Sequence, residues 1–136
     1  MNNLLTAIMT KCTGSALSTA VGGRIFLDEA PEGSEFPYVV FSIISGTPQD
    51  TFSEKIEETL IQFSLYSISS GAAEITAMYA ALKTLLDGQL LTITDNTCIW
   101  VMRQNLTTMI DEITTPSGTF GAKHWDAGYS IMGQKT

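Results

Sequence analysis

Residue types that usually carry acid–base or nucleophilic catalysis are sparse in this chain, whose single histidine is His124. A nucleophilic site needs a serine or cysteine held against such a base. His124 lies between Lys123 and Trp125 on a segment that alternates like a strand, and no feature of the sequence places a partner beside it. Catalytic use of His124 stays open, but the pattern favours a histidine facing solvent or a neighbouring subunit. We therefore predict that the chain is not an enzyme.

Acidic side chains gather in a segment that also contains proline and glycine. They are Asp28, Glu29, Glu32 and Glu35. Carboxylates can hold a cation, but these lack the alternating Asp/Asn spacing of a calcium loop. The two cysteines, Cys12 and Cys98, fit neither a CxxC redox motif nor a zinc pattern, and we expect reduced, buried thiols. The sequence therefore predicts a solvated acidic loop and no metal site.

Phosphate-binding signals are also weak. The glycine-containing stretch 14–23 lacks the Gly-Lys-Ser/Thr ending that places an amine and a hydroxyl on phosphate. Seven basic residues against 14 acidic ones give a net charge of −7, and the basic residues are scattered along the chain. No basic stripe can then neutralise a run of phosphates. We predict no cofactor and no tight binding of nucleic acid.

Hydrophobic periodicity predicts the elements that must position these residues. Apolar residues three or four apart predict one helix ending after Cys12 and a second over 72–86, with Asp87-Gly88 as its stop. Strands are predicted at 24–27, 38–44, 59–68, 98–106 and 124–132. This order predicts an α+β fold, a mostly antiparallel sheet of about five strands with two main helices packed on one face. Residues 1–136 have the length of one domain.

Alternation in the last two predicted strands places the larger apolar side chains of each on one face. The residues expected on one face are Trp100, Met102 and Leu106 in the first strand, and Trp125, Ala127, Tyr129 and Ile131 in the second. The two strands are expected to pair antiparallel. Residues 107–122 connect them, over a length typical of a functional arm rather than a plain loop. Because this connection is apolar at Met109, Ile110 and Ile113, we predict a projecting assembly arm.

Composition points to a subunit of an assembly. Of the 136 residues, 44% are hydrophobic and only 15% are charged, so the chain has ample material for a core and few charges to cover its surface. Some apolar surface is therefore expected to meet another subunit. The N-terminal stretch has no basic leader and no apolar run is long enough to span a bilayer, so we expect neither a signal peptide nor a membrane anchor.

Short motifs occur in a fixed order along nearly the whole chain. They are Gly23-Arg24-Ile25-Phe26, Ala30-Pro31-Glu32-Gly33, Phe36-Pro37-Tyr38-Val39-Val40, Ile61-Gln62-Phe63-Ser64-Leu65-Tyr66, the helix over 72–86, and Gly121-Ala122-Lys123-His124-Trp125-Asp126-Ala127-Gly128-Tyr129-Ser130-Ile131. In this order they resemble the tail-terminator, or tail-completion, proteins of long-tailed bacteriophages. The connection at 107–122 departs from that pattern and is expected to adapt the subunit to its own neighbours.

The resemblance implies a structural virion protein, made in the host cytoplasm. Such proteins form a ring, commonly of six subunits, that caps the head-proximal end of the tail tube, stops tail growth and joins the head connector. The implied partners are further copies of the chain, the tail tube protein and the connector or stopper protein. Genomic DNA passes through the channel without specific binding, which suits the acidic balance because like charge discourages sticking.

Two other interpretations stay open, a different neck or head-completion subunit and a stand-alone ligand-binding or enzymatic α+β domain. For an assembly protein, contacts are expected from the loops at 28–35 and 46–54 and from the arm, since loops on a rigid sheet are where binding surfaces vary. The expected contact residues are Asp28, Glu29, Glu32, Glu35, Asp50, Phe52, Met109, Ile110, Ile113 and Phe120.

Overall fold

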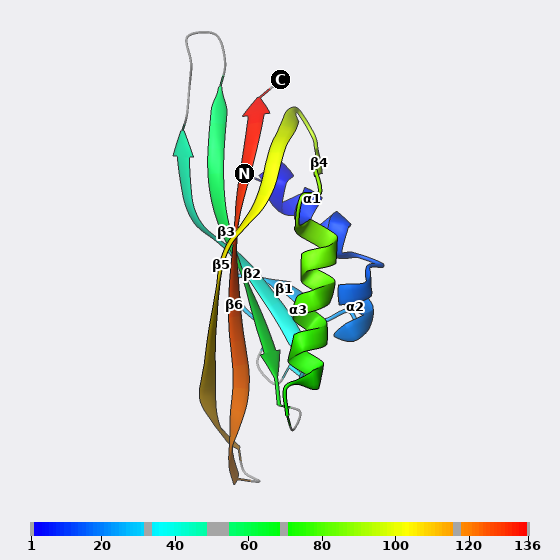
Figure 1. Cartoon of the computed structure of the whole chain (residues 1–136), viewed down its shortest axis with the longest axis vertical. Helices are drawn as coiled ribbons and strands as arrows, with labels where there is room; N and C mark the ends of the chain where they lie inside the picture. The colour runs from blue at the N-terminus through cyan, green and yellow to red at the C-terminus, as the bar shows by residue number, and fades with distance from the viewer. Residues whose placement is uncertain (1, 32–33, 49–54, 69–70, 116–117, 136) are drawn as a thin grey trace.

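A mixed six-stranded sheet forms the centre of the computed structural model, which describes residues 2–31, 34–48, 55–68, 71–115 and 118–135 (Figure 1). The strands are β1 (Ile25–Leu27), β2 (Tyr38–Pro48), β3 (Ile56–Ser67), β4 (Thr92–Ile93), β5 (Asn96–Thr115) and β6 (Gly118–Lys135). Their order across the sheet is β1-β2-β3-β6-β5-β4. β1 runs parallel to β2, and the other neighbouring strands pair antiparallel.

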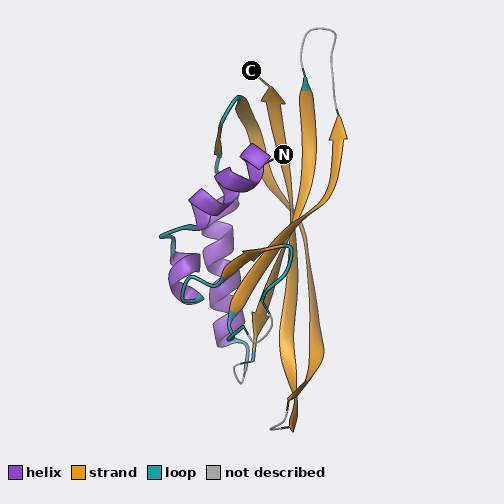
Figure 2. Cartoon of the chain, turned by 180° about the vertical axis from the view of Figure 1, so that it is seen from behind, coloured by secondary structure: helices purple, strands orange, loops and turns teal. Residues whose placement is uncertain are grey.

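Three helices pack on one face of this sheet, and the described part of the chain places none on the other (Figure 2). They are α1 (Asn2–Cys12), α2 (Ala16–Ala20) and α3 (Ala73–Leu86). α3 buries one stripe against the sheet, formed by Ile75, Met78, Tyr79, Leu82 and Leu86. This stripe follows the 3.6-residue period from which the helix was predicted. We call the uncovered side of the sheet the helix-free face.

The core lies between the helices and the inner side of β2, β3 and β6. Every second residue of β3 points inward, as its period of two requires, and Phe63 is fully buried. Its ring centroid lies 5.8 Å from that of Phe41 on β2 and 5.7 Å from that of Tyr129 on β6. On β6, Ala127, Tyr129 and Ile131 belong to this core and share one face, as the alternation predicted. These contacts bind the three central strands to one another.

The predicted α+β class is confirmed, while the strand count and pairing differ from the prediction. The sheet has six strands instead of about five, because the two-residue β4 is too short to leave a pattern in the sequence. β1 is parallel to its neighbour, which makes the sheet mixed. The five-residue helix α2 was also not predicted, although Ser15 caps it by accepting a hydrogen bond from the backbone N–H of Ser18.

The connection predicted at 107–122 is not a loop. β5 continues to Thr115 and β6 begins at Gly118, with the ladder paired as far as Thr115 and Gly118. Both views show this hairpin extending well past the helices (Figures 1 and 2). Because no layer covers it there, neither side of the hairpin needs to be uniformly apolar, and its sequence lacks the alternation that marked the other strands.

Two bulges in β5 overturn the prediction that Trp100, Met102 and Leu106 share a face. The register shifts between Cys98 and Trp100 and again between Arg103 and Asn105. Trp100 therefore lies on the helix-free face, where its indole N–H donates to Ser130 Oγ at 3.4 Å. Met102 lies on the same face, whereas Leu106 packs against the core. An extra residue in a strand reverses the direction of the side chains that follow it.

Candidate assembly surfaces

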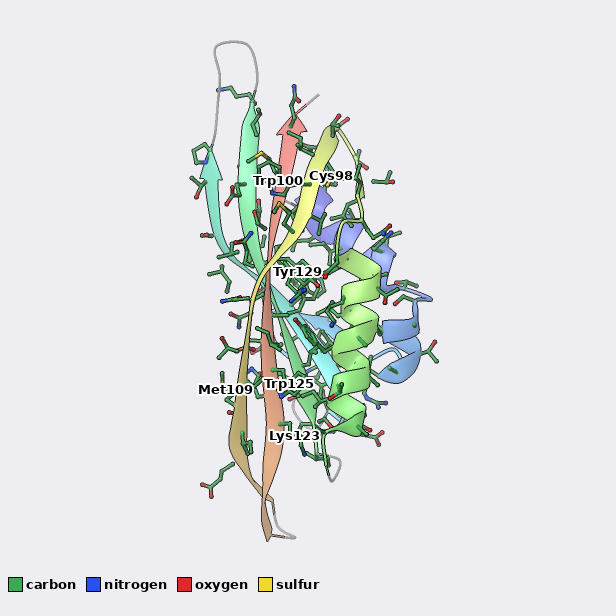
Figure 3. The ribbon with its side chains drawn as sticks, viewed as in Figure 1. Cys98, Trp100, Met109, Lys123, Trp125 and Tyr129 are labelled. Atoms are coloured by element: carbon green, nitrogen blue, oxygen red, sulfur yellow. The ribbon has the colours of Figure 1, made fainter. Side chains whose placement is uncertain are left out.

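A row of aromatic rings crosses the helix-free face from strand to strand. Tyr38 on β2 lies opposite Tyr66 on β3, and Tyr66 lies opposite His124 on β6. The ring centroids are 4.8 Å apart for the two tyrosines and 4.3 Å apart for Tyr66 and His124. Met109 on β5 is the next cross-strand neighbour of His124. Figure 3 shows Met109 on the side of the sheet away from α3, and Trp125 on the side facing it.

His124 is held between two carboxylates on this face. Its Nδ1 lies 2.9 Å from Asp111 Oδ2. Its Nε2 lies 2.6 Å from Asp126 Oδ1, although the two groups are not aligned for a hydrogen bond. Ser64 Oγ donates to Asp126 at 2.7 Å and so is directed to the carboxylate instead of the imidazole. The arrangement therefore fixes the histidine on the sheet and does not form a serine–histidine pair.

His124 points in the predicted direction, but it is not open to solvent. His124 points to the opposite face from Trp125, as the alternation required. Its side chain is only 15% exposed, however, because Tyr66 stacks on the ring and the carboxylates flank it. Burial and the nearby Tyr38 and carboxylate groups raise the pKa of Tyr66 to about 12, so this phenol stays neutral at physiological pH.

The predicted contact residues fall on separate parts of the sheet. Asp28 and Glu29 are exposed directly after β1, at one edge, and Glu35 lies 4.0 Å from the guanidinium of Arg24. Met109 and Ile110 lie on β5, near the other edge, with 38% and 73% of their surface exposed. The acidic loop and the hairpin therefore do not converge on one site.

Other predicted contacts can be placed only in part. Ile113 and Phe120 lie opposite each other in the β5–β6 ladder, so the hairpin does bring them together. Glu32, Asp50 and Phe52 lie outside the described residues.

A polar cluster between α3 and the sheet had no signal in the sequence. The hydroxyl of Tyr129 donates to Asp87 Oδ1 at 2.6 Å, and Arg103 Nε donates to Asp87 Oδ2 at 3.2 Å. Arg103 Nη1 also donates to the hydroxyl of Tyr79 at 2.9 Å. Burial, and then the bond to Asp87, raise the pKa of Tyr129, which keeps its proton. The cluster fastens the end of α3 to β5 and β6.

The substitution Asp87→Ala is expected to lower the free energy of unfolding by about 1–3 kcal/mol, because the fully buried Tyr129 hydroxyl would lose its acceptor. Urea denaturation followed by circular dichroism would measure the loss. Asp87→Asn is the matched control, since it keeps an acceptor oxygen and should cost less. Equal stability of the parent and the Asp87→Ala variant would contradict the role given to this cluster.

Both cysteines are free and buried. Burial raises the pKa of the Cys12 thiol to about 11, so only a small fraction is thiolate at pH 8. We expect neither thiol to react with Ellman's reagent in the native protein and both to react in urea. Rapid labelling of Cys12 before unfolding would show that the N-terminal helix opens readily, and rapid labelling of Cys98 would show the same of the start of β5.

Two further observations bear on the kind of site present. Within the described ranges, no group of three or more His, Cys, Asp and Glu side chains could hold a metal ion. No helix in that same part of the chain is long and apolar enough to cross a membrane.

Comparison with protein families decides the identity. The family model for tail completion protein gp17 matches residues 6–117. The chain belongs to this family. It is therefore a structural protein of a bacteriophage tail, and the virion is where it resides. The resemblance drawn from the motifs is confirmed.

The tail completion protein also shares its fold with a solved virion structure. A chain from the virion of a native gene transfer agent particle is 17% identical and superposes with a TM-score of 0.72. The match covers 96% of the tail completion protein and 94% of that chain, so the likeness extends over nearly the whole of both chains. Comparison of the sequence with curated proteins gave no match.

Proposed function

We propose that this tail completion protein forms a ring, of six copies, at the head-proximal end of the tail tube. There it stops tube growth and joins the tail to the head connector or stopper. The family match over residues 6–117 carries the proposal, because completing a tail requires a component that sits where the tube ends. Its partners are then further copies of itself, the tail tube protein and the connector.

The two ends of the sheet supply distinct surfaces for two different partners. The β2–β3 hairpin extends past the helices at one end and the β5–β6 hairpin at the other (Figures 1 and 2). Each carries exposed apolar side chains, Ile44 with 52% of its surface exposed near the first end and Ile110 near the second. Exposed apolar groups of this kind are typical of surfaces that become covered on assembly. One hairpin would contact the tube and the other the connector.

The acidic balance supports a channel through which DNA slides. With 14 acidic and seven basic residues, the protein repels phosphate on average. Genomic DNA would therefore pass a ring of these subunits without being held, and specific binding of DNA is not part of the proposed function.

Native mass spectrometry and negative-stain imaging of the protein, alone and mixed with purified tail tubes, test the proposal. A closed ring, free or bound at one end of each tube, is the expected result. A ring that ignores tubes but binds isolated heads would instead assign the protein to another neck or head-completion position. A monomer that binds neither tubes nor heads would contradict the proposal.

A further inference from the structure

Two strand edges of the sheet have no neighbouring strand in the described structure. β1 pairs only with residues 39–41 of β2, which leaves the outer side of 42–48 open. β4 pairs only with residues 96 and 97 of β5, which leaves the rest of that long strand with β6 on one side alone. Open edges of this length are templates for pairing with another chain.

The backbone direction along β5 follows from one hydrogen bond. The carbonyl of Val101 accepts from the N–H of Gly88, so the backbone groups of Val101 face away from β6. Antiparallel pairing alternates this direction, and the bulge between Arg103 and Asn105 resets it. Beyond the bulge, Leu106, Thr108 and Ile110 direct their N–H and carbonyl groups outward.

This part of β5 lacks the usual protection of an edge strand. The ladder runs without a register shift from Asn105 to Thr115. Residues 105–110 contain no proline and no charged side chain. Isolated edge strands are normally blocked by lysine, proline or a bulge. This edge of β5 is therefore open to pairing with a strand of another chain.

The open edge of β2 is partly protected, by the bulge after Ile43 and by Pro48, but it still presents outward backbone groups. The carbonyl of Phe41 accepts from the N–H of Asp28, so its backbone faces the β1 side. After the bulge between Ile43 and Ser45, Gly46 and Pro48 face that side. Proline lacks an N–H and is tolerated in a strand where that N–H would point away from the sheet. Residues 42–48 also carry no charge.

We infer that the β5 edge of one copy pairs with the β2 edge of the next copy, so that the sheet continues from subunit to subunit. This inference rests on the proposed ring and adds how its subunits are joined. β2 and β5 run in opposite directions, because three antiparallel pairings separate them. A rotation that places the copies side by side leaves these strand directions unchanged. At the junction, β5 of one copy and β2 of the next therefore run antiparallel.

A second copy fits these edges better than a different protein does. The two open edges lie on opposite sides of one sheet, so each copy offers what its neighbour lacks, which is the heterologous interface that closes a ring. Neither edge would bury an unpaired charge on pairing. The open part of β2 lies toward the β2–β3 hairpin, and the open part of β5 lies toward the β5–β6 hairpin at the other end of the sheet. Neighbouring copies must therefore be shifted along the strand direction when these edges pair, as tilted strands are in a closed barrel.

Paired cysteines test this junction. Thr47 and Thr107 are exposed on the helix-free face beside the two edges, and the native cysteines are buried. The double variant Thr47→Cys/Thr107→Cys, treated with a flexible bis-maleimide alone and on tail tubes, should give a ladder of covalent multimers up to the copy number of the ring. Each single variant should stay monomeric in the gel.

A backbone substitution gives an independent test. Thr108→Pro removes one outward N–H while leaving the bonds to β6, and it should weaken ring formation by about tenfold or more, the effect of losing roughly one hydrogen bond at each junction. Thr108→Val keeps the N–H and should form rings normally. Both variants should keep the circular dichroism spectrum of the parent.

The possible outcomes distinguish failure of the edge pairing from failure of the proposed ring. Rings on tube ends without a ladder in the double variant would overturn the edge pairing and leave the proposed function standing. Dimers from Thr107→Cys alone would show that two β5 edges pair with each other, which also overturns it. Absence of both rings and ladder would overturn the junction and the proposed function together.

Discussion

Replacing residues 112–121 with an Asn-Gly turn is expected to give a folded subunit that no longer joins its partner. Asp111 and Ala122, the residues on either side of the cut, are direct cross-strand neighbours, and Asn-Gly is the dipeptide that best closes a two-residue hairpin. Among the side chains described at 107–112 and 121–123, only Ala122 is buried. The core residues described above all lie outside 112–121 and stay in place in the shortened variant.

The effect on function should be much larger than the effect on stability. We expect the free energy of unfolding to change by about 1 kcal/mol or less, as for exposed substitutions. Ring formation should persist, because the open edge at 105–111 remains. Joining to the tube or connector should fall to background, because the end of the hairpin is gone.

Denaturation curves, native mass and counts of capped tubes in negative stain would measure these three properties in one preparation. Glu112→Ala is the matched control, since it changes an exposed side chain of the hairpin without shortening it, and it should cap tubes normally. An unfolded shortened variant would place the hairpin in the core. Normal capping of tubes by the shortened variant would show that the end of the hairpin does not contact the tube.

Elements with one buried face could be predicted from the sequence. The stripe of α3 and its stop at Asp87-Gly88 were visible because burial against the sheet imposes a period of 3.6. Asp87 appeared only as the end of a helix. Its role as acceptor for Tyr129 depends on a partner 42 residues away, which no local pattern records.

Strand irregularities were not predictable in the same way. Each bulge in β5 inserts one residue, and sequence alternation has no means of marking which residue is extra. Trp100, Met102 and Leu106 were consequently assigned to one face, although Trp100 and Met102 lie on the helix-free face and Leu106 packs against the core. β6 has no such shift opposite β3, and its alternation was predicted correctly.

The candidate contact surface shows the same limit. Met109 and Ile110 were grouped because they are adjacent and apolar. In the hairpin they point to opposite faces, Met109 beside His124 on the helix-free face and Ile110 beside Lys123 on the other. One predicted patch is therefore two, and a partner that covers one of them need not touch the other.

Phe63→Ala is expected to cause the largest loss of stability of any single substitution considered for this protein. The Phe63 ring is fully buried between Phe41 and Tyr129, and its removal would leave a cavity between the three strands that carry the sheet. Such substitutions cost about 3–5 kcal/mol, a large part of the ordinary stability of a domain. Urea denaturation would measure the loss, and the midpoint of thermal unfolding should fall by on the order of 10 °C or more.

The neighbouring position on the same strand provides the control. Gln62 points to the helix-free face and is half-buried, so Gln62→Ala should cost about 1 kcal/mol or less. Because the core trio holds together the sheet that presents both open edges, the Phe63→Ala variant should also form fewer rings at a temperature where the parent forms them fully. A Phe63→Ala variant within about 1 kcal/mol of the parent would mean that the inner face of β3 is not the centre of the core.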